Sequence, residues 1–205
     1  MNQSIQAKRK DGELVKLTLK RLTFEDIDQI MALQDEIVEG LEDKQLYVPS
    51  DREEIQSHFS TEGVLLGYVT EENELVALAI YLKRGYSPSN YGYDVGLEGE
   101  ELLKVGQVDT VLVKADYRGN NLQYRMCSLL EEIAKEKQTP ILCATASPYN
   151  TFSVNNFLKL GYEVKKDKLK YGGLRRYILM KSLPMVTSGR PENATISPAV
   201  MLSHG

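Results

Sequence analysis

Histidine and cysteine are scarce in this sequence, which holds two of each among 205 residues and has no tryptophan. A histidine-based metal centre or a serine hydrolase triad would depend on His58 or His204, and both lie in polar stretches where a solvated histidine is expected. With only Cys127 and Cys143 there is no disulfide framework, and a reducing compartment is expected. We therefore predict no bound metal and no hydrolase triad.

Long apolar runs are also missing. The first residues, MNQSIQAKRKDGELVKL, have no apolar core of the kind a signal peptide needs, and no later run approaches the length of a membrane span. The net charge of -4 and the pI of about 5.4 argue against the basic face of a nucleic-acid binder. We expect a cytoplasmic protein with no nucleic acid and no membrane among its partners.

The sequence does contain a regular succession of strand and helix patterns. The balance of 42% hydrophobic and 26% charged residues is that of a globular domain. Alternating residues predict a first strand, and Thr23, with Asp26 three positions later, is a candidate helix N-cap. In chain order we predict a strand at 14–21, helices at 24–41 and 51–59, strands at 63–70, 75–83 and 105–114, a helix at 122–137, a strand at 140–146, a helix at 153–160, and strands at 162–166 and 175–182.

These elements make up one domain, 1–183. From Pro184 onward the composition shifts to Pro, Ser, Thr and Gly with little periodicity. This shift predicts a flexible C-terminal tail, 184–205, and docking of the tail on the domain or on a neighbouring subunit is the alternative.

The stretch 108–130 carries the clearest chemical signal. It is a strand, a tight turn and a helix, and the turn reads Arg118-Gly119-Asn120-Asn121-Leu122-Gln123. Such a turn directs backbone N–H groups and the positive end of the helix dipole at one point, which suits a pyrophosphate. Arg118 adds a full positive charge. An ordinary strand-to-helix connection is the alternative, because short glycine-containing motifs are weak evidence alone.

This stretch resembles motif A of the GNAT superfamily of N-acetyltransferases, which reads Arg or Gln, two residues, Gly, one residue, and Gly or Ala. Arg118 takes the first place, followed by Gly119. Asn121 stands at the first motif glycine and Gln123 at the second. Because Asn tolerates a positive φ better than most residues, Asn121 is expected to keep the turn. Gln123 adds a side chain where the motif has almost none.

A second match lies in ASPYNTFSVNNFLKLGYEV, which resembles GNAT motif B: an Asn, a small residue three positions later, an aromatic residue seven positions later, then Leu-Gly-Phe. Here these are Asn150, Ser153, Phe157 and Leu160-Gly161-Tyr162, with no gap. Both motifs, in order, imply an α/β (α+β) GNAT fold. Its central, mixed, mostly antiparallel twisted sheet would have six to seven strands flanked by about four helices.

The resemblance also implies acetyl-CoA as cosubstrate and assigns its contacts. Backbone groups of one strand would hold the pantetheine arm and the acetyl group, the turn would hold the pyrophosphate, and two residues of the second motif would contact the arm and the thioester. In that order the residues are Val111, Leu112 and Val113; Arg118, Gly119, Asn120, Asn121, Leu122 and Gln123; and Asn150 and Phe157.

The general acid and base are less clearly marked. Many relatives have a tyrosine general acid where Phe157 stands, and Phe has no proton to give. The thiolate leaves unaided, or another residue donates, with Tyr149, Tyr171 and Tyr177 as candidates.

For the base, Asp109 lies where relatives often have a carboxylate. By strict alternation it shares a strand face with Gln107, Val111 and Val113. The alternatives to Asp109 are the carboxylates near the end of the first helix, which are otherwise expected to be surface charges: Glu36, Glu39 and Glu42.

The resemblance implies transfer of an acetyl group to a primary amine of a small molecule or peptide, with a homodimer as a possible assembly. A catalytically silent module that only binds acyl-CoA is the alternative. Arg175 and Arg176 begin the last strand, where a solvated face is expected and contact with an acceptor carboxylate is the alternative. Cys127 and Cys143 are expected to be buried and inert.

Overall fold

The computed structural model describes residues 3–60 and 62–185. Its strands are β1 (Ser4–Lys8), β2 (Leu14–Arg21), β3 (Val64–Val69), β4 (Leu75–Leu82), β5 (Val105–Val113), β6 (Ile141–Ala146), β7 (Glu163–Lys170) and β8 (Leu174–Ser182). Its α-helices are α1 (Ile27–Glu39), α2 (Arg52–Ser60), α3 (Leu122–Glu136) and α4 (Thr151–Lys159). Several short 3-10 turns connect them.

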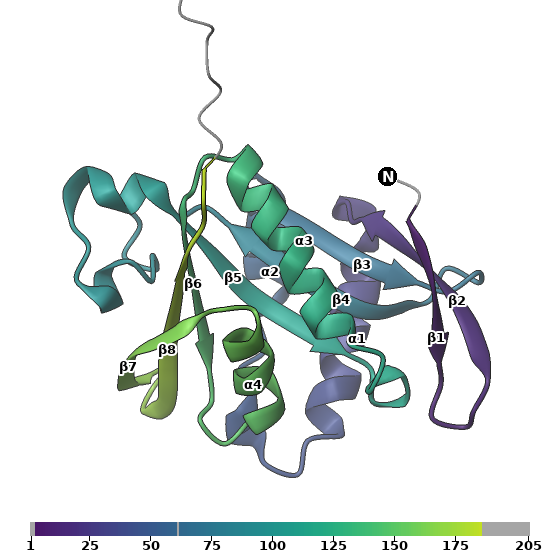
Figure 1. Cartoon of the computed structure of the whole chain (residues 1–205). Coiled ribbons are helices and arrows are strands. Elements are labelled where there is room, and N and C mark those ends of the chain that lie inside the picture. Colours follow the sequence, from purple (N-terminus) through teal and green to yellow (C-terminus); the bar gives the residue numbers. More distant parts are fainter. Residues whose placement is uncertain (1–2, 61, 186–205) are drawn as a thin grey trace, which may run out of the picture.

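All eight strands form one sheet in the order β1-β2-β3-β4-β5-β6-β8-β7 (Figure 1). Every neighbouring pair is antiparallel except β5 and β6, which are parallel. The predicted mixed, mostly antiparallel sheet and its four helices are confirmed. The strand count exceeds the six to seven expected.

The additional strand is β1, which the sequence analysis overlooked. It pairs with β2 through a tight turn in which Gly12 has a φ of 96°. Asp11-Gly12 is a pair typical of hairpin turns, so the sequence did contain this signal. Ala7 of β1 is fully buried and belongs to the core cluster.

Helices cover both faces of the sheet. α3 and α4 pack on one face, where Met126, Leu130 and Phe157 join the buried cluster. α1 and α2 pack on the other, where Ile30 and Ile55 join a second cluster. β3 and β4 are buried at every position because they lie between these two layers. Figure 1 shows α3 crossing the sheet in front and α1 and α2 behind it.

Most element boundaries agree with the prediction to within two or three residues. The N–H of Thr23 donates to the Asp26 side chain at 2.9 Å, which confirms the cap, and a 3-10 turn at Phe24–Asp26 precedes α1. β7 is longer than predicted, because its exposed, charged sequence has no apolar alternation and its extent is set by pairing with β8. Apart from residues 184 and 185, the predicted tail lies outside the described residues.

None of the helices within the described residues combines the length and the apolar character needed to cross a membrane.

Gly106 is the glycine of β5 at which a side chain has no room. An added Cβ would lie 2.5 Å from Tyr81 Cε2 and 2.8 Å from Thr139 Oγ1. Those two side chains are joined by a buried hydrogen bond of 2.8 Å. Overpacking of this kind costs about 1–3 kcal/mol, so Gly106→Ala should lower the thermal midpoint by several degrees, by roughly 2–4 °C per kcal/mol.

The matched control is Gly40→Ala at the end of α1, where the nearest atom to an added Cβ is Glu36 O at 3.4 Å. Thermal unfolding followed by circular dichroism compares the two variants. Equal midpoints for Gly106→Ala and the wild-type protein would contradict the packing described here.

Candidate functional site

A cavity of about 830 Å³ opens where β5 and β6 part. The two strands pair only over 105–108 and 141–144, although β5 continues to Val113 and β6 to Ala146. Beyond that point, the edge of β5 that faced β6 has no strand partner among the described residues. Unpaired N–H and C=O groups on a strand edge can bond to an extended ligand laid beside them.

The parting begins at a β-bulge in β5. Ile80 of β4 pairs with Thr110, and the next residue of β4, Tyr81, pairs with Val108. Asp109 is therefore the extra residue on β5. Bulges bend a strand and increase its twist, which accounts for the divergence of β5 from β6 after this position.

The bulge also corrects the predicted orientation of Asp109. Strict alternation placed it on the face of Val111 and Val113, but these two pack on the α3 side of the sheet. Asp109 instead faces α2, on the side where Leu112 packs. The prediction was wrong because the bulge shifts the alternation by one position. Asp109 nonetheless lines the cavity.

The turn before α3 has the predicted form. Gly119 has a φ of 87° and Asn121 a φ of 57°, so Asn121 does keep the turn open in the left-handed region. Asn121 is the N-cap, yet its side chain makes no capping hydrogen bond. The first N–H groups of a helix lack intrahelical partners. Those of α3 therefore stay available to an anion beside the exposed Arg118, which also lines the cavity.

Asn120 has a structural role in this turn. Its side chain accepts from the N–H of Lys8 at 2.7 Å and donates to the carbonyl of Lys8 at 2.8 Å. It also donates to the carbonyl of Tyr117 at 2.9 Å. Asn120 thus ties the turn to β1, and its side chain is directed away from the ligand that the motif predicts for it.

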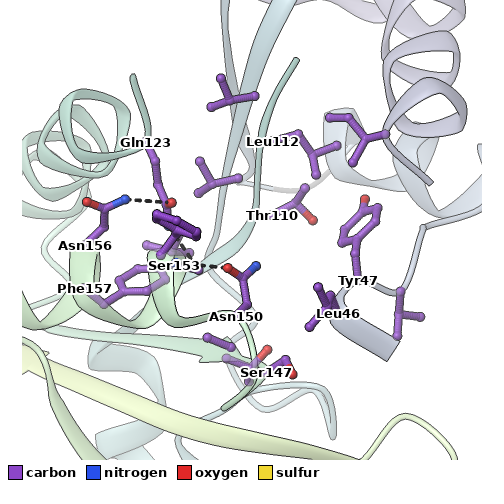
Figure 2. Close-up of a pocket in the computed structure, with 18 of the residues that line it drawn as sticks. Leu46, Tyr47, Thr110, Leu112, Gln123, Ser147, Asn150, Ser153, Asn156 and Phe157 are labelled. Atoms are coloured by element: carbon purple, nitrogen blue, oxygen red, sulfur yellow. Dashed lines mark hydrogen bonds between the residues drawn. The ribbon is translucent and has the colours of Figure 1, made fainter. Parts of the chain in front are cut away.

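Gln123 joins the two helices that flank the cavity. Its amide nitrogen donates to Ser153 Oγ at 3.0 Å, and its oxygen accepts from the Asn156 amide at 3.0 Å (Figure 2). The side chain that replaces the second motif glycine is therefore held against α4. This contact could not be read from the motif, because Asn156 lies more than thirty residues away in the chain.

Asn150 and Phe157 both line the cavity, from the start and the interior of α4. The Asn150 side chain caps α4 by accepting from the N–H of Ser153 at 3.1 Å. Phe157 is buried and packs edge-on against Tyr162, with ring centroids 5.1 Å apart. Figure 2 shows this wall facing Leu46 and Tyr47 across β5.

The three candidate tyrosines differ in position. Tyr171 lines the cavity, and its hydroxyl lies 2.8 Å from that of Tyr91 and 3.0 Å from Thr145 Oγ1. Tyr149 also lines the cavity and is largely exposed. Tyr177 instead packs against the core cluster that α3 and α4 cover, and it is absent from the cavity wall that the described residues form. The prediction of Tyr177 as an acid is therefore wrong in position.

His58 is fully buried, and the predicted solvated histidine is wrong. It lies three residues after the buried Ile55, on the same face of α2, which is the helical spacing that could have revealed it. Its Nε2 is 3.9 Å from Asp109 Oδ2. Burial lowers the pKa of His58, and Arg84 lowers it further, while Asp109 and Glu54 act in the opposite direction.

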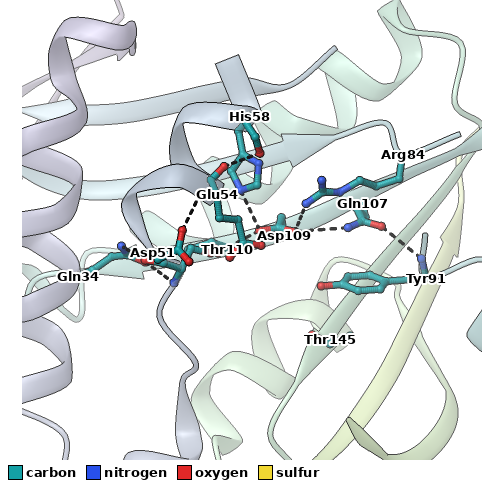
Figure 3. A network of polar contacts seen from close by, with 12 residues as sticks. Gln34, Asp51, Glu54, His58, Arg84, Tyr91, Gln107, Asp109, Thr110 and Thr145 are labelled. Carbon is teal, nitrogen blue, oxygen red and sulfur yellow. Dashed lines mark hydrogen bonds and ion pairs between the residues drawn. The ribbon is translucent and has the colours of Figure 1, made fainter. Parts of the chain in front are cut away.

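Asp109 is the centre of a polar network that the sequence analysis missed (Figure 3). Arg84 lies 3.7 Å from its carboxylate, and Gln107 donates to it at 3.3 Å. Gln107 in turn accepts from the N–H of Tyr91 at 3.3 Å. The loop after β4 thereby reaches the bulge, which makes it part of the site.

The other charged candidates are exposed on the surface, with one exception that is buried in the cavity wall. Glu36 pairs with Lys114 at 2.6 Å, and like Glu39 and Glu42 it is exposed, as the surface interpretation predicted. Arg175 is exposed, also as predicted, and it pairs with Asp167. Arg176 is only 4% exposed and lines the cavity, so the solvated face predicted for it is wrong.

Both cysteines are buried, and burial raises the pKa of each thiol to about 12. Such thiols are poor nucleophiles, in agreement with the inert role predicted for them. Within the described residues, no group of three or more His, Cys, Asp and Glu side chains is placed to hold a metal ion.

Comparison with known proteins connects this geometry to one family. The sequence model of the Acetyltransferase (GNAT) family matches residues 27–162. The comparison with curated protein sequences found no match.

Solved structures share the fold at low identity. An N-acetyltransferase from Staphylococcus aureus Mu50 is 15% identical, with a TM-score of 0.63 over 82% of this chain and 99% of that one. The structure of yncA from Salmonella typhimurium with its cofactor acetyl-CoA is 14% identical, with a TM-score of 0.63 over 85% and 98%. The ribosomal-protein-S18-alanine N-acetyltransferase from Escherichia coli is 14% identical, with a TM-score of 0.60 over 86% and 98%.

The buried His58 predicts a specific acid sensitivity. Its pKa in the folded protein lies below the ordinary histidine value of 6.5, so the unfolded chain binds more protons as the pH falls past that value. The stability that the neutral imidazole contributes is complete above about pH 6.5 and is lost as the pH falls toward the lower, folded pKa. Urea unfolding between pH 8 and pH 5 measures this loss.

The comparison is with His58→Gln, which cannot titrate and retains His204. We expect the free energy of unfolding to fall less steeply with acidification in the variant than in the wild-type protein. Parallel pH profiles would show that His58 titrates alike in the folded and unfolded chains.

Proposed function

The chain belongs to the GNAT family of acetyltransferases, and from this premise we propose that it transfers an acetyl group from acetyl-CoA directly to a primary amine of a small molecule or peptide. The observation that supports the proposal most is a combination. The unpaired edge of β5 lies in the same cavity as the uncapped start of α3. An extended thioester arm ending in a pyrophosphate needs both features in one place.

The residues present fit this cosubstrate. Arg118, Gly119 and the first amides of α3, at Asn121, Leu122 and Gln123, would bind the pyrophosphate. Backbone groups of Val111, Leu112 and Val113 would hold the pantetheine arm. Gln123 is compatible with this role because its side chain is engaged with α4. Asn120 would contribute to pyrophosphate binding indirectly, because its side chain ties the turn to β1.

Acetyl-CoA, when bound, supplies a thioester carbonyl that a neutral amine can attack. The amine must first lose a proton, and Asp109 is the carboxylate on the bulge that lines the cavity. We assign it the role of base. Gln107 and Arg84 hold its carboxylate in position. A backbone N–H on the open edge of β5 would donate to the carbonyl oxygen as negative charge develops there.

Two of the candidate tyrosines, Tyr149 and Tyr171, line the cavity and could donate a proton to the leaving thiolate. Phe157 cannot donate, and Tyr177 is directed into the core. Tyr171 has its hydroxyl in the cavity, held by Tyr91 and Thr145, and we assign it the role of acid. A thiol with an ordinary pKa of roughly 8.5 can also leave as the thiolate. Tyr171 therefore assists the reaction without being indispensable to it.

The test is thiol release from acetyl-CoA in the presence of pooled amines, with mass spectrometry of the acetylated products. Turnover supports the enzyme. Thermal stabilisation by CoA without turnover identifies a silent acyl-CoA-binding module, the alternative that Phe157 favours.

Arg118→Glu should weaken CoA binding by at least about tenfold, because a charge-assisted contact becomes a repulsion. Lys104→Glu, the same change at an exposed site outside the cavity, is the control.

Replacing Asp109 tests the proposed base. Asp109→Asn keeps the shape of the side chain and removes its basicity, so kcat should fall by about 10²- to 10⁴-fold while the stabilisation by CoA is retained. The exposed carboxylate of Glu36 provides the matched control, and Glu36→Gln should turn over at the wild-type rate. A kcat for Asp109→Asn within threefold of the wild-type value would exclude Asp109 as the base.

A further inference from the structure

A positive charge is buried in the cavity wall at Arg176 of β8. Its side chain is only 4% exposed and crosses from β8 to the segment before α2, where it donates to the carbonyl of Gln45 at 2.7 Å. It also donates to the carbonyl of Arg175 at 2.8 Å, and its guanidinium carbon lies 5.7 Å from the centre of the Tyr171 ring. Arg176 therefore lies beside the proposed acid.

Among the described residues, two of the five N–H donors of the Arg176 guanidinium have hydrogen-bond acceptors, the carbonyls of Arg175 and Gln45. No carboxylate lies within ion-pairing distance of it among residues 3–60 and 62–185, whereas Arg175 next to it does pair with Asp167. An unpaired charge in a protein wall is costly, and planar Arg donors suit a carboxylate with two parallel hydrogen bonds.

A negative charge lies in the same cavity at Asp109. A chain of contacts connects the two charges: Asp109 to Gln107, Gln107 to Tyr91, Tyr91 to Tyr171, and Tyr171 to Arg176. Both Asp109 and Arg176 line the cavity. An acceptor that reached both side chains would meet an anion at Asp109 and a cation at Arg176.

We propose that the acetyl acceptor is an amine that carries its own carboxylate, with the amino group at Asp109 and the carboxylate bound by Arg176. This inference rests on the proposed function, and it assigns the substrate class for the same site. Arg176 is a specificity-determining residue in this arrangement. The hydroxyl of Thr145, which also lines the cavity, can add a hydrogen bond to the bound anion.

The charges at the two proposed contact points favour a carboxylate over a phosphate. Arg176 is one cation, and Asp109, which lines the same cavity, would repel a dianion. A monoanion joined to an ammonium group places an opposite charge beside each of these two side chains. A phosphate-bearing amine is thus an outcome of the test that would overturn the proposal.

The experiment compares acceptors that differ in the carboxylate alone. The L-amino acids, β-alanine and 4-aminobutyrate are assayed against matched probes, such as butylamine for 4-aminobutyrate and alaninamide for alanine, with phosphoethanolamine as the phosphate probe. kcat/KM is calculated per neutral amine, because the matched probes differ in amine pKa. We expect the best acceptor to carry a carboxylate and to exceed its matched amine by at least about tenfold.

The variants are Arg176→Gln, Arg176→Lys and the control Arg175→Gln, which changes an exposed neighbour on the same strand. Arg176→Gln should lower kcat/KM for the carboxylated acceptor, chiefly through KM, by at least about tenfold more than it lowers kcat/KM for the matched amine. Arg176→Lys should restore part of the loss because it keeps the charge without the two-pronged geometry. Stabilisation by CoA should be equal in all three.

The outcomes separate this inference from the proposed function. Equal kcat/KM with and without the carboxylate, or an Arg176→Gln variant with unchanged preference, overturns the inference and leaves the proposed acetyltransferase function unaffected.

Absence of turnover with every amine overturns the proposed function. Binding then decides the inference, by the thermal shift that the same amino acids produce on the CoA-saturated protein. That shift should vanish in Arg176→Gln, and its absence from the wild-type protein would overturn the inference. Should Arg176→Gln fail to fold, the preference of the wild-type protein for the carboxylated acceptor over its matched amine tests the inference by itself.

Discussion

One extra residue in β5 is the constraint on which the rest of the site depends. The bulge at Asp109 bends the strand, and β5 and β6 separate directly after their fourth pair. The separation exposes a strand edge inside the molecule, where backbone groups would otherwise be paired. It also turns Asp109 toward α2, so the same local irregularity opens the cavity and places a carboxylate in its wall. With regular strand pairing and no bulge, neither the cavity nor the carboxylate in its wall would be present.

The start of α3 shows how a motif can change its residues and keep its geometry. Asn121 adopts the left-handed conformation that a glycine would favour, and its side chain leaves the first turn uncapped. The polar side chains around it work as tethers instead. Asn120 holds the turn to β1, and Gln123 holds α3 to α4. Gln123, which stands where the motif has its second glycine, therefore adds rigidity while its side chain is engaged with α4.

Polar and ionisable side chains are concentrated in the same region. Asp109 and Arg176 line one cavity, Arg84 and His58 lie against Asp109, and ionic groups in such places contribute little net stability. Apolar residues of similar volume would often be tolerated as well or better in a core. Clusters of this kind are typical of functional sites, where perturbed groups serve chemistry and recognition. The sheet and its two apolar layers supply the stability that allows them.

The sequence by itself determined the elements, the turn before α3 and the family, because these depend on local periodicity and on motifs of a few adjacent residues. Asp11-Gly12 and the spacing of Ile55 to His58 were also legible, and were overlooked. Only the tertiary structure decided which face of the sheet Asp109 lies on, that Arg175 is exposed while Arg176 is buried, and that Tyr177 does not line the cavity. A bulge is defined by the partner strand, and the burial of a charge is defined by what packs over it. Neither partner is near in the chain, so no local pattern could reveal them.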